Sequence, residues 1–154
     1  MAAVILLRKA GPDDAVAVGA LTRAAYGKWV PVIGREPLPM QADPVKAIAL
    51  HRVDLLEDAG KVLALIETYR ATGHLWVENL AVDPDAQGRG LGTRLMGHAE
   101  TLARACDLFE MRLLTNPAFT GNLAFYQRLG FVIDRQEPFL GGSTAYLSKR
   151  LTAS

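Results

Sequence analysis

The sequence predicts an α/β (α+β) protein whose mixed, mostly antiparallel sheet of about seven strands carries helices on both faces. Short apolar runs bounded by turn residues are typical of strands. A turn over 58–61 joins two such runs, 53–57 and 62–69, so these strands should be antiparallel neighbours. A helical segment separates the runs 75–82 and 110–115, which should therefore lie parallel through a right-handed crossover.

Local signals predict the remaining elements. An apolar run at 4–8 predicts a first strand, and Asp13 is a suitable N-cap for a helix over about 14–26. Residues 27–43 are rich in proline and predict an irregular loop, after which Asp43-Pro44 should begin a short helix that runs to about His51. A later helix over about 122–129 should stop at Gly130, and the last strands are expected at 131–134 and 145–149.

Composition and charge exclude several classes of protein. A chain of 154 residues, half of them hydrophobic, fits one domain over 1–154 with a substantial core. The net charge of +1 and the absence of a basic block indicate no nucleic-acid partner. No apolar run approaches the roughly 20 residues of a membrane span, and the start does not resemble a signal peptide. The single cysteine, Cys106, favours a reducing, cytoplasmic setting, and no histidine has metal-ligand spacing, so no metal is expected.

The stretch 75–105 predicts a strand over 75–82, a glycine-rich loop over 83–92 and a helix over 93–105. A helix start offers unpaired backbone N–H groups and the positive end of a dipole, and glycines let this backbone approach a ligand closely. The stretch therefore predicts an anion site, with a phosphate as the expected anion. The apolar residues of the helix recur at spacings of three and four and should form its inner stripe: Leu91, Leu95, Met96, Ala99, Leu102 and Ala103.

The spacing of the glycines separates this loop from two common phosphate-binding loops. No Gly-Lys-Ser or Gly-Lys-Thr ending is present, as a P-loop requires. Thr93 stands where the dinucleotide fingerprint needs its last glycine, and five residues separate the strand from Gly88. What remains is the pattern Gln87-x-x-Gly90-x-Gly92.

This pattern resembles the acetyl-CoA signature Q/R-x-x-G-x-G/A of the GCN5-related N-acetyltransferases, the GNAT family. The preceding segment 78–84, ENLAVDP, also resembles the central strand of that family. A second landmark agrees, since segment 122–131, NLAFYQRLGF, is similar to the region N-x-x-A-x-x-x-Y/F-x-x-x-G-F/Y. The order of predicted elements is similar to the whole acyl-CoA N-acyltransferase fold, so the resemblance covers nearly the full chain.

The resemblance implies transfer of the acetyl group of acetyl-CoA to a primary amine of a small molecule by direct attack in a ternary complex, with a peptide or protein amine as the less favoured acceptor. Backbone N–H groups of the glycine loop would hold the pyrophosphate. The pantetheine arm would lie in a gap between the central and fifth strands, which a β-bulge near Asn79-Leu80 would open. The implied cofactor-binding residues are Leu80, Ala81, Val82, Gln87, Gly88, Arg89, Gly90, Leu91, Gly92, Thr93, Asn122 and Tyr126.

Two residues are candidates for proton transfer. By resemblance, Tyr126 would protonate the departing thiolate; the less favoured alternative is a core tyrosine whose hydroxyl is satisfied. Strand alternation puts Trp76, Glu78 and Leu80 on one face, where burial would make Glu78 a stronger base. The alternatives for the base are Glu67, His74 and a chain of waters, and Asn122 could cap its helix instead of contacting the cofactor.

The loop over 27–43 is the expected place of substrate selection. Tyr26, Trp29, Arg35 and Met40 either pack over the edge of the core or wall a substrate pocket. Their mixture suggests a small molecule with an apolar part and a carboxylate. Two other functions remain open: a non-catalytic acyl-CoA-binding sensor and an unrelated phosphate-ligand enzyme. A homodimer is compatible with a fold of this type.

Overall fold

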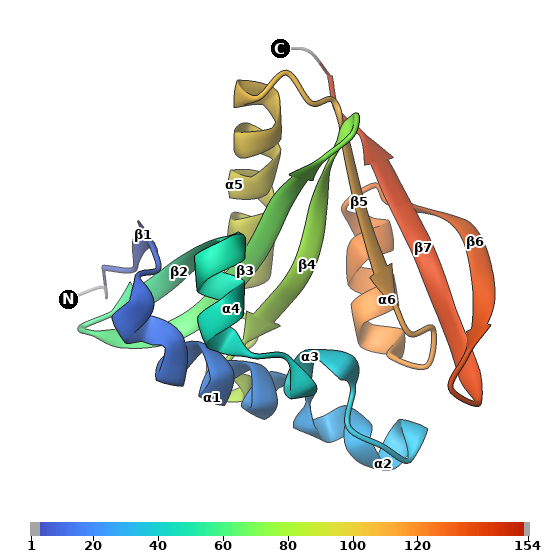
Figure 1. Cartoon of the computed structure of the whole chain (residues 1–154), viewed down its shortest axis with the longest axis horizontal. Coiled ribbons are helices and arrows are strands. Elements are labelled where there is room, and N and C mark those ends of the chain that lie inside the picture. The colour runs from blue at the N-terminus through green and yellow to red at the C-terminus, as the bar shows by residue number, and fades with distance from the viewer. Residues whose placement is uncertain (1–3, 153–154) are drawn as a thin grey trace.

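Among the residues that the structure describes, seven strands form one sheet in the order β1-β2-β3-β4-β5-β7-β6 (Figure 1). The computed structural model describes residues 4–152, so residues 1–3 and 153–154 of the expected domain lie outside the described residues. Strands β4 and β5 are parallel, and the other neighbouring pairs are antiparallel. The predicted class, a mixed and mostly antiparallel sheet with helices, is confirmed.

The strands match the predicted runs closely except near the C-terminus. Their bounds are β1 (Leu6–Lys9), β2 (Arg52–Asp58), β3 (Lys61–Ala71), β4 (His74–Val82), β5 (Glu110–Thr115), β6 (Val132–Phe139) and β7 (Gly142–Arg150). The prediction that β6 ends at 134 is wrong, because the strand continues through Pro138 to Phe139. Proline is tolerated there because β6 is an edge strand, and no strand within residues 4–152 pairs with its outer side.

The helices begin earlier than predicted in the second half of the chain. Their bounds are α1 (Ala15–Tyr26), α2 (Val30–Ile33), α3 (Leu38–Gln41), α4 (Pro44–Leu50), α5 (Leu91–Ala105) and α6 (Thr120–Arg128), with 3-10 turns η1 (Pro12–Asp14), η2 (Gly27–Trp29) and η3 (Pro84–Ala86). The predicted loop over 27–43 thus contains short helical turns, whose prolines occupy first-turn positions that need no N–H partner. The predicted cap Asp43 accepts a hydrogen bond from Val45 N–H at 2.9 Å.

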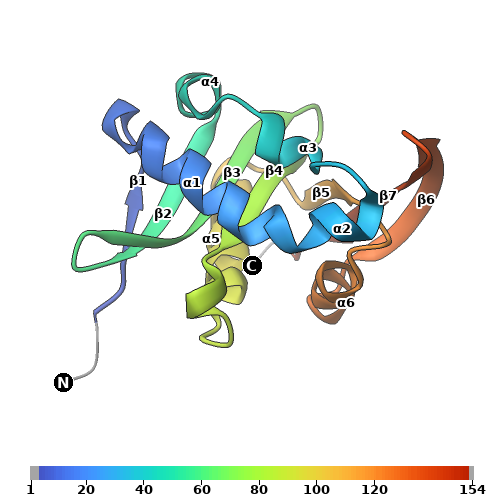
Figure 2. The ribbon, with the colours of Figure 1, turned by 90° about the horizontal axis from the view of Figure 1, so that it is seen from below.

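Helices cover both faces of the sheet, with α1 on one side and α5 on the other (Figure 2). Alternate residues of the strands belong to two apolar clusters, one on each face of the sheet. Leu55 and Leu65 pack on the α1 side, whereas Leu56 and Ile66 pack on the α5 side. The predicted inner stripe of α5 is buried, except that Leu102 is only partly buried. Within residues 4–152, no helix has the length and apolar character that crossing a membrane requires.

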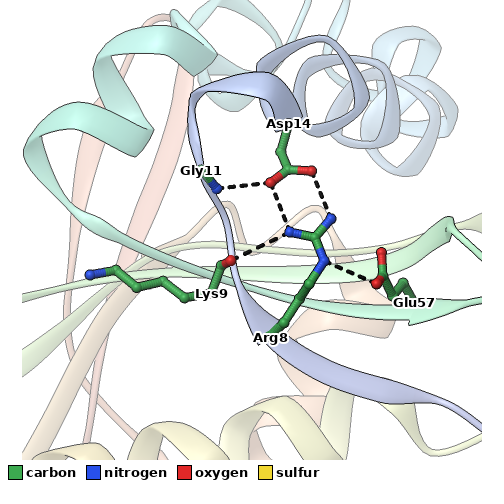
Figure 3. A network of polar contacts seen from close by, with 5 residues as sticks. All are labelled: Arg8, Lys9, Gly11, Asp14 and Glu57. Carbon is green, nitrogen blue, oxygen red and sulfur yellow. Dashed lines mark hydrogen bonds and ion pairs between the residues drawn. The ribbon is translucent and has the colours of Figure 1, made fainter.

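An ion-pair network joins β1, the start of α1 and the end of β2 (Figure 3). Arg8 donates two hydrogen bonds to Asp14, at 2.8 and 2.9 Å, and its Nε lies 3.0 Å from Glu57. Asp14 also accepts from Gly11 N–H at 2.8 Å. The predicted N-cap Asp13 is therefore wrong, since Asp14 makes the contact that fixes the entry to α1. The Arg8 hydrogen bond and then the Gly11 N–H lower the pKa of Asp14 to about 2.

This lowered pKa predicts a pH-dependent contribution to stability. The Asp14 carboxylate stabilises the fold above its unfolded pKa of about 3.9, and this stabilisation is lost as the pH falls towards 2. Because the Arg8 side chain is 39% exposed, solvent screening reduces the contribution to about 1 kcal/mol. Asp14→Asn should lower the free energy of unfolding by this amount at pH 7 in urea titrations, and by progressively less as the pH falls through 2.

The neighbouring Asp13→Asn is the matched control, because Asp13 has no ion pair within residues 4–152. Equal losses in the two variants at pH 7, or a difference between them that does not shrink as the pH falls from 4 to 2, would contradict the assignment.

Candidate active site

One extra residue in β4 opens the centre of the sheet. Asn79 lies opposite Glu67 of β3, and Val77 lies opposite Thr68, so Glu78 has no counterpart and forms a β-bulge. Strand β4 pairs with β5 only at Leu75 and Trp76. Beyond these residues the two strands diverge (Figure 1). The bulge thus lies within one residue of its predicted place.

The bulge also changes which side chains share a face of β4. Leu80 packs with the α5-side cluster, whereas Ala81 belongs to the α1-side cluster and Asn79 bonds to Thr22 of α1. Because an extra residue shifts the alternation by one, Leu80 turns away from the face that carries Trp76. The prediction that Trp76, Glu78 and Leu80 share one face is therefore wrong.

A cavity of about 370 Å³ lies between the second half of β4, the glycine loop and α6. Arg89 is exposed and does not line it. Lys28 and Arg128 do line it, although neither is among the predicted cofactor-binding residues. Only their basic character could have suggested a place beside a phosphate. Most of the predicted cofactor-binding residues line this cavity: Leu80, Ala81, Val82, Gln87, Gly88, Gly90, Leu91, Gly92, Thr93, Asn122 and Tyr126.

The glycine loop and the start of α5 line this cavity. Gly90 is the N-cap of α5 with φ of +73°, so the helix begins at Leu91 and not at the predicted Thr93. Its first turn closes with Arg94 N–H donating to Gly90 O at 3.0 Å, which leaves the preceding N–H groups without helical partners. A Cβ on Gly92 would lie 3.2 Å from the Phe125 ring, so glycine allows α5 to approach α6. The arrangement suits an anion at the positive end of a fifteen-residue helix.

Tyr126 lines the same cavity from α6 and is 7% exposed. Its ring packs edge-on against Phe125 and Phe131. Burial, with a smaller effect from Tyr26, raises the pKa of the Tyr126 phenol well above its usual value, so the hydroxyl stays protonated. The proposed capping role of Asn122 is wrong, because Phe119 is the N-cap and Asn122 is the third residue of α6.

A second cavity of about 390 Å³ lies on the α1 side of the sheet. Tyr26 lines both cavities and donates a hydrogen bond to Leu80 O at 3.3 Å, so it forms part of the wall between them. Arg35 also lines the second cavity. Trp29 is not a lining residue but stacks on Phe119, which does line the cavity, with 4.8 Å between the ring centroids. Met40 is not among the lining residues, and its carbonyl instead accepts from Arg23.

Two carboxylates and one amide face the second cavity near the bulge. Glu78 is exposed, contrary to the expected burial, because it is the extra residue of the bulge; its carboxylate accepts from Trp76 Nε1 at 2.7 Å. Glu67 is buried, and its Oε2 lies 2.6 Å from His51 Nδ1. Asn79 donates to Thr22 Oγ1, but within residues 4–152 its buried Oδ1 has no hydrogen-bond partner.

The other predicted polar candidate lies elsewhere. His74 sits at the start of β4 beside Thr72 O and lines neither cavity. The contact between His51 and Glu67 joins the end of α4 to the middle of β3, so no local signal in the sequence predicts it.

Comparison with known proteins identifies the family. The model of the acetyltransferase (GNAT) family matches residues 24–131, which is most of the chain, and the chain belongs to this family. Similar solved structures include PaiA N-acetyltransferase from Thermoplasma acidophilum in complex with coenzyme A, with a TM-score of 0.80 and 16% identity over 96% of this chain and 99% of that chain. The ribosomal-protein-S18-alanine N-acetyltransferase from Escherichia coli gives a TM-score of 0.78 and 18% identity over 98% and 96%.

Nourseothricin acetyltransferase gives a TM-score of 0.75 and 21% identity over 96% of this chain and 99% of that chain. At these identities, the three similarities show a shared fold.

Proposed function

We propose that this protein transfers the acetyl group of acetyl-CoA to a primary amine of a small molecule in a ternary complex. The observation that carries the proposal is the pair of cavities that share Tyr26 as a wall residue. A thioester in the first cavity and an amine in the second would meet beside the bulge of β4. Membership of the acetyltransferase family and the coenzyme A complex of a structural neighbour support this reading.

The first cavity would hold acetyl-CoA through several groups. Backbone N–H groups at the start of α5 would bind the pyrophosphate, with Lys28 and Arg128 supplying positive charge at the cavity. The pantetheine arm would lie along residues 80–82, where β4 has no pairing with β5. Its amide groups could then bond to β4 as an added strand would.

The reaction requires two proton transfers. The amine nitrogen attacks the thioester carbonyl, the C–N bond forms and the C–S bond breaks, and the coenzyme leaves as a thiolate. A base takes the ammonium proton, and we assign the donor to the thiolate as Tyr126. Burial raises the pKa of the Tyr126 phenol, so it carries its proton when the coenzyme leaves as a thiolate.

Glu78 is the proposed base, acting directly or through water. It lies beside Asn79 and lines the second cavity, which would hold the acceptor amine and is called the acceptor cavity below. Its exposure gives it access to solvent, which can carry the proton away. Glu67 lines the same cavity but already shares its carboxylate with His51. His74 lies outside both cavities, which removes the geometric support for it as the base.

Replacement of the proposed acid should separate binding from turnover. Tyr126→Phe should keep the stabilisation by acetyl-CoA in a melting experiment but lower amine-dependent thiol release by about 10²- to 10⁴-fold. Tyr146→Phe is the control, because Tyr146 lies on β7 and lines neither cavity. Unchanged turnover in Tyr126→Phe would remove the assignment. Acetyl-CoA binding without thiol release from the wild type, over a broad panel of amines, would instead favour a non-catalytic sensor.

The two carboxylates can be distinguished by pH–rate profiles of thiol release. Glu78→Gln should lower kcat/KM and abolish the fall in rate at acidic pH that a titrating base produces, because glutamine does not ionise. Glu67→Gln should retain that acidic limb. Retention of the limb in Glu78→Gln and its loss in Glu67→Gln would transfer the role to Glu67.

A further inference from the structure

Arg35 presents unused hydrogen-bond donors to the acceptor cavity. It is half-buried, its Nη1 donates to Glu36 O at 3.2 Å, and its guanidinium lies over the Phe139 ring at 5.7 Å. Within residues 4–152, no carboxylate lies within ion-pair distance of it. The adjacent Glu36 carboxylate pairs instead with Arg23 at 2.8 Å. A guanidinium with free donors in a largely apolar cavity is suited to a carboxylate, which it can bind through two parallel hydrogen bonds.

The segment that carries Arg35 is fixed on both sides. Gly34 ends α2 in the left-handed conformation, and the Pro37 side chain is fully buried. Arg23 of α1 also donates to Met40 O, which ties the following turn to the same helix. These contacts hold Arg35 at one end of the cavity.

The opposite end of the cavity is suited to an amine. The unpartnered Oδ1 of Asn79 is a buried acceptor, which is costly to leave without a donor. Glu67 lies directly across from Asn79 on β3, and Glu78 adds a second carboxylate. An ammonium or amine N–H would satisfy these acceptors. Asn79 is followed in β4 by Leu80, whose carbonyl accepts a hydrogen bond from Tyr26. Leu80 and Tyr26 form the wall towards the proposed thioester.

The sheet order separates these two ends. Glu67 belongs to β3, whereas Arg35 contacts Phe139 of β6, and β4, β5 and β7 lie between those strands. With strands about 4.8 Å apart, the acidic and cationic ends are separated by roughly 10 Å or more. Both views place α2 towards the β6–β7 side and α4 towards the other (Figures 1 and 2). Apolar side chains of Ile33, Leu38, Leu114 and Phe119 line the same cavity.

From this arrangement we infer that the acceptor carries its primary amine and a carboxylate at opposite ends of an apolar segment, and that Arg35 binds the carboxylate. The inference rests on the proposed function. It makes Arg35 the residue that determines specificity among amines, while the reacting groups remain those of the bulge and Tyr126.

Matched amines test this inference through thiol release from acetyl-CoA. The wild type should use 6-aminohexanoate with a kcat/KM on the order of tenfold to a hundredfold above that for hexylamine, as for one charge-assisted pair. The same preference should hold for 4-(aminomethyl)benzoate over benzylamine. Arg35→Gln should remove most of the preference. Lys46→Gln should retain it, because Lys46 is an exposed cation on α4, at the other side of the cavity.

Each contrary result has a distinct meaning. Equal use of the acid and the neutral amine by the wild type would overturn the inference and leave the proposed function intact. A preference that survives in Arg35→Gln, or disappears in Lys46→Gln, would also overturn it. Failure to acetylate any amine, although acetyl-CoA binds, would overturn the proposed function together with the inference.

Discussion

The extra residue in β4 is the constraint on which the candidate active site depends. Without Glu78, β4 could continue its pairing with β5, and their backbone groups would be satisfied within the sheet. With it, the strands separate after Trp76, and successive residues of β4 face different cavities. Asn79 lines the acceptor cavity, whereas Leu80 lines the cavity next to the glycine loop. Two ligands can therefore meet across a single strand.

The surrounding structure holds this opening in place from both faces. Apolar clusters on the α1 and α5 sides share strands β2 and β3, so the half of the sheet that precedes the opening is fully packed. The buried Asn79 Oδ1, which has no hydrogen-bond partner within residues 4–152, lies at the opening. The buried phenol of Tyr126 lines the neighbouring cavity, and burial keeps it protonated. Incomplete satisfaction inside an otherwise packed domain is typical of sites where a ligand completes the hydrogen bonds.

Local sequence patterns predicted the structural features that depend on residues close together in the sequence. They predicted the glycine loop, the inner stripe of α5 and the Asp43 cap, since each depends on residues within one or two helical turns. They failed where pairing between strands decides the outcome. The face of Leu80 and the exposure of Glu78 depend on the register with β3, and the contact between His51 and Glu67 depends on how α4 packs. The resemblance predicted a bulge but could not say which side chains it would turn.

Ligand-induced stabilisation tests the central claim, that the opened strand and the glycine loop form a coenzyme A site, most directly. The melting temperature should be measured with acetyl-CoA, free coenzyme A, NAD and ATP in parallel. A ligand at one hundred times its Kd stabilises a protein by about 2.7 kcal/mol, which for a domain of this size raises the melting temperature by several degrees. We predict this rise with acetyl-CoA and coenzyme A alone. No rise with either, or an equal rise with NAD or ATP, would contradict the account.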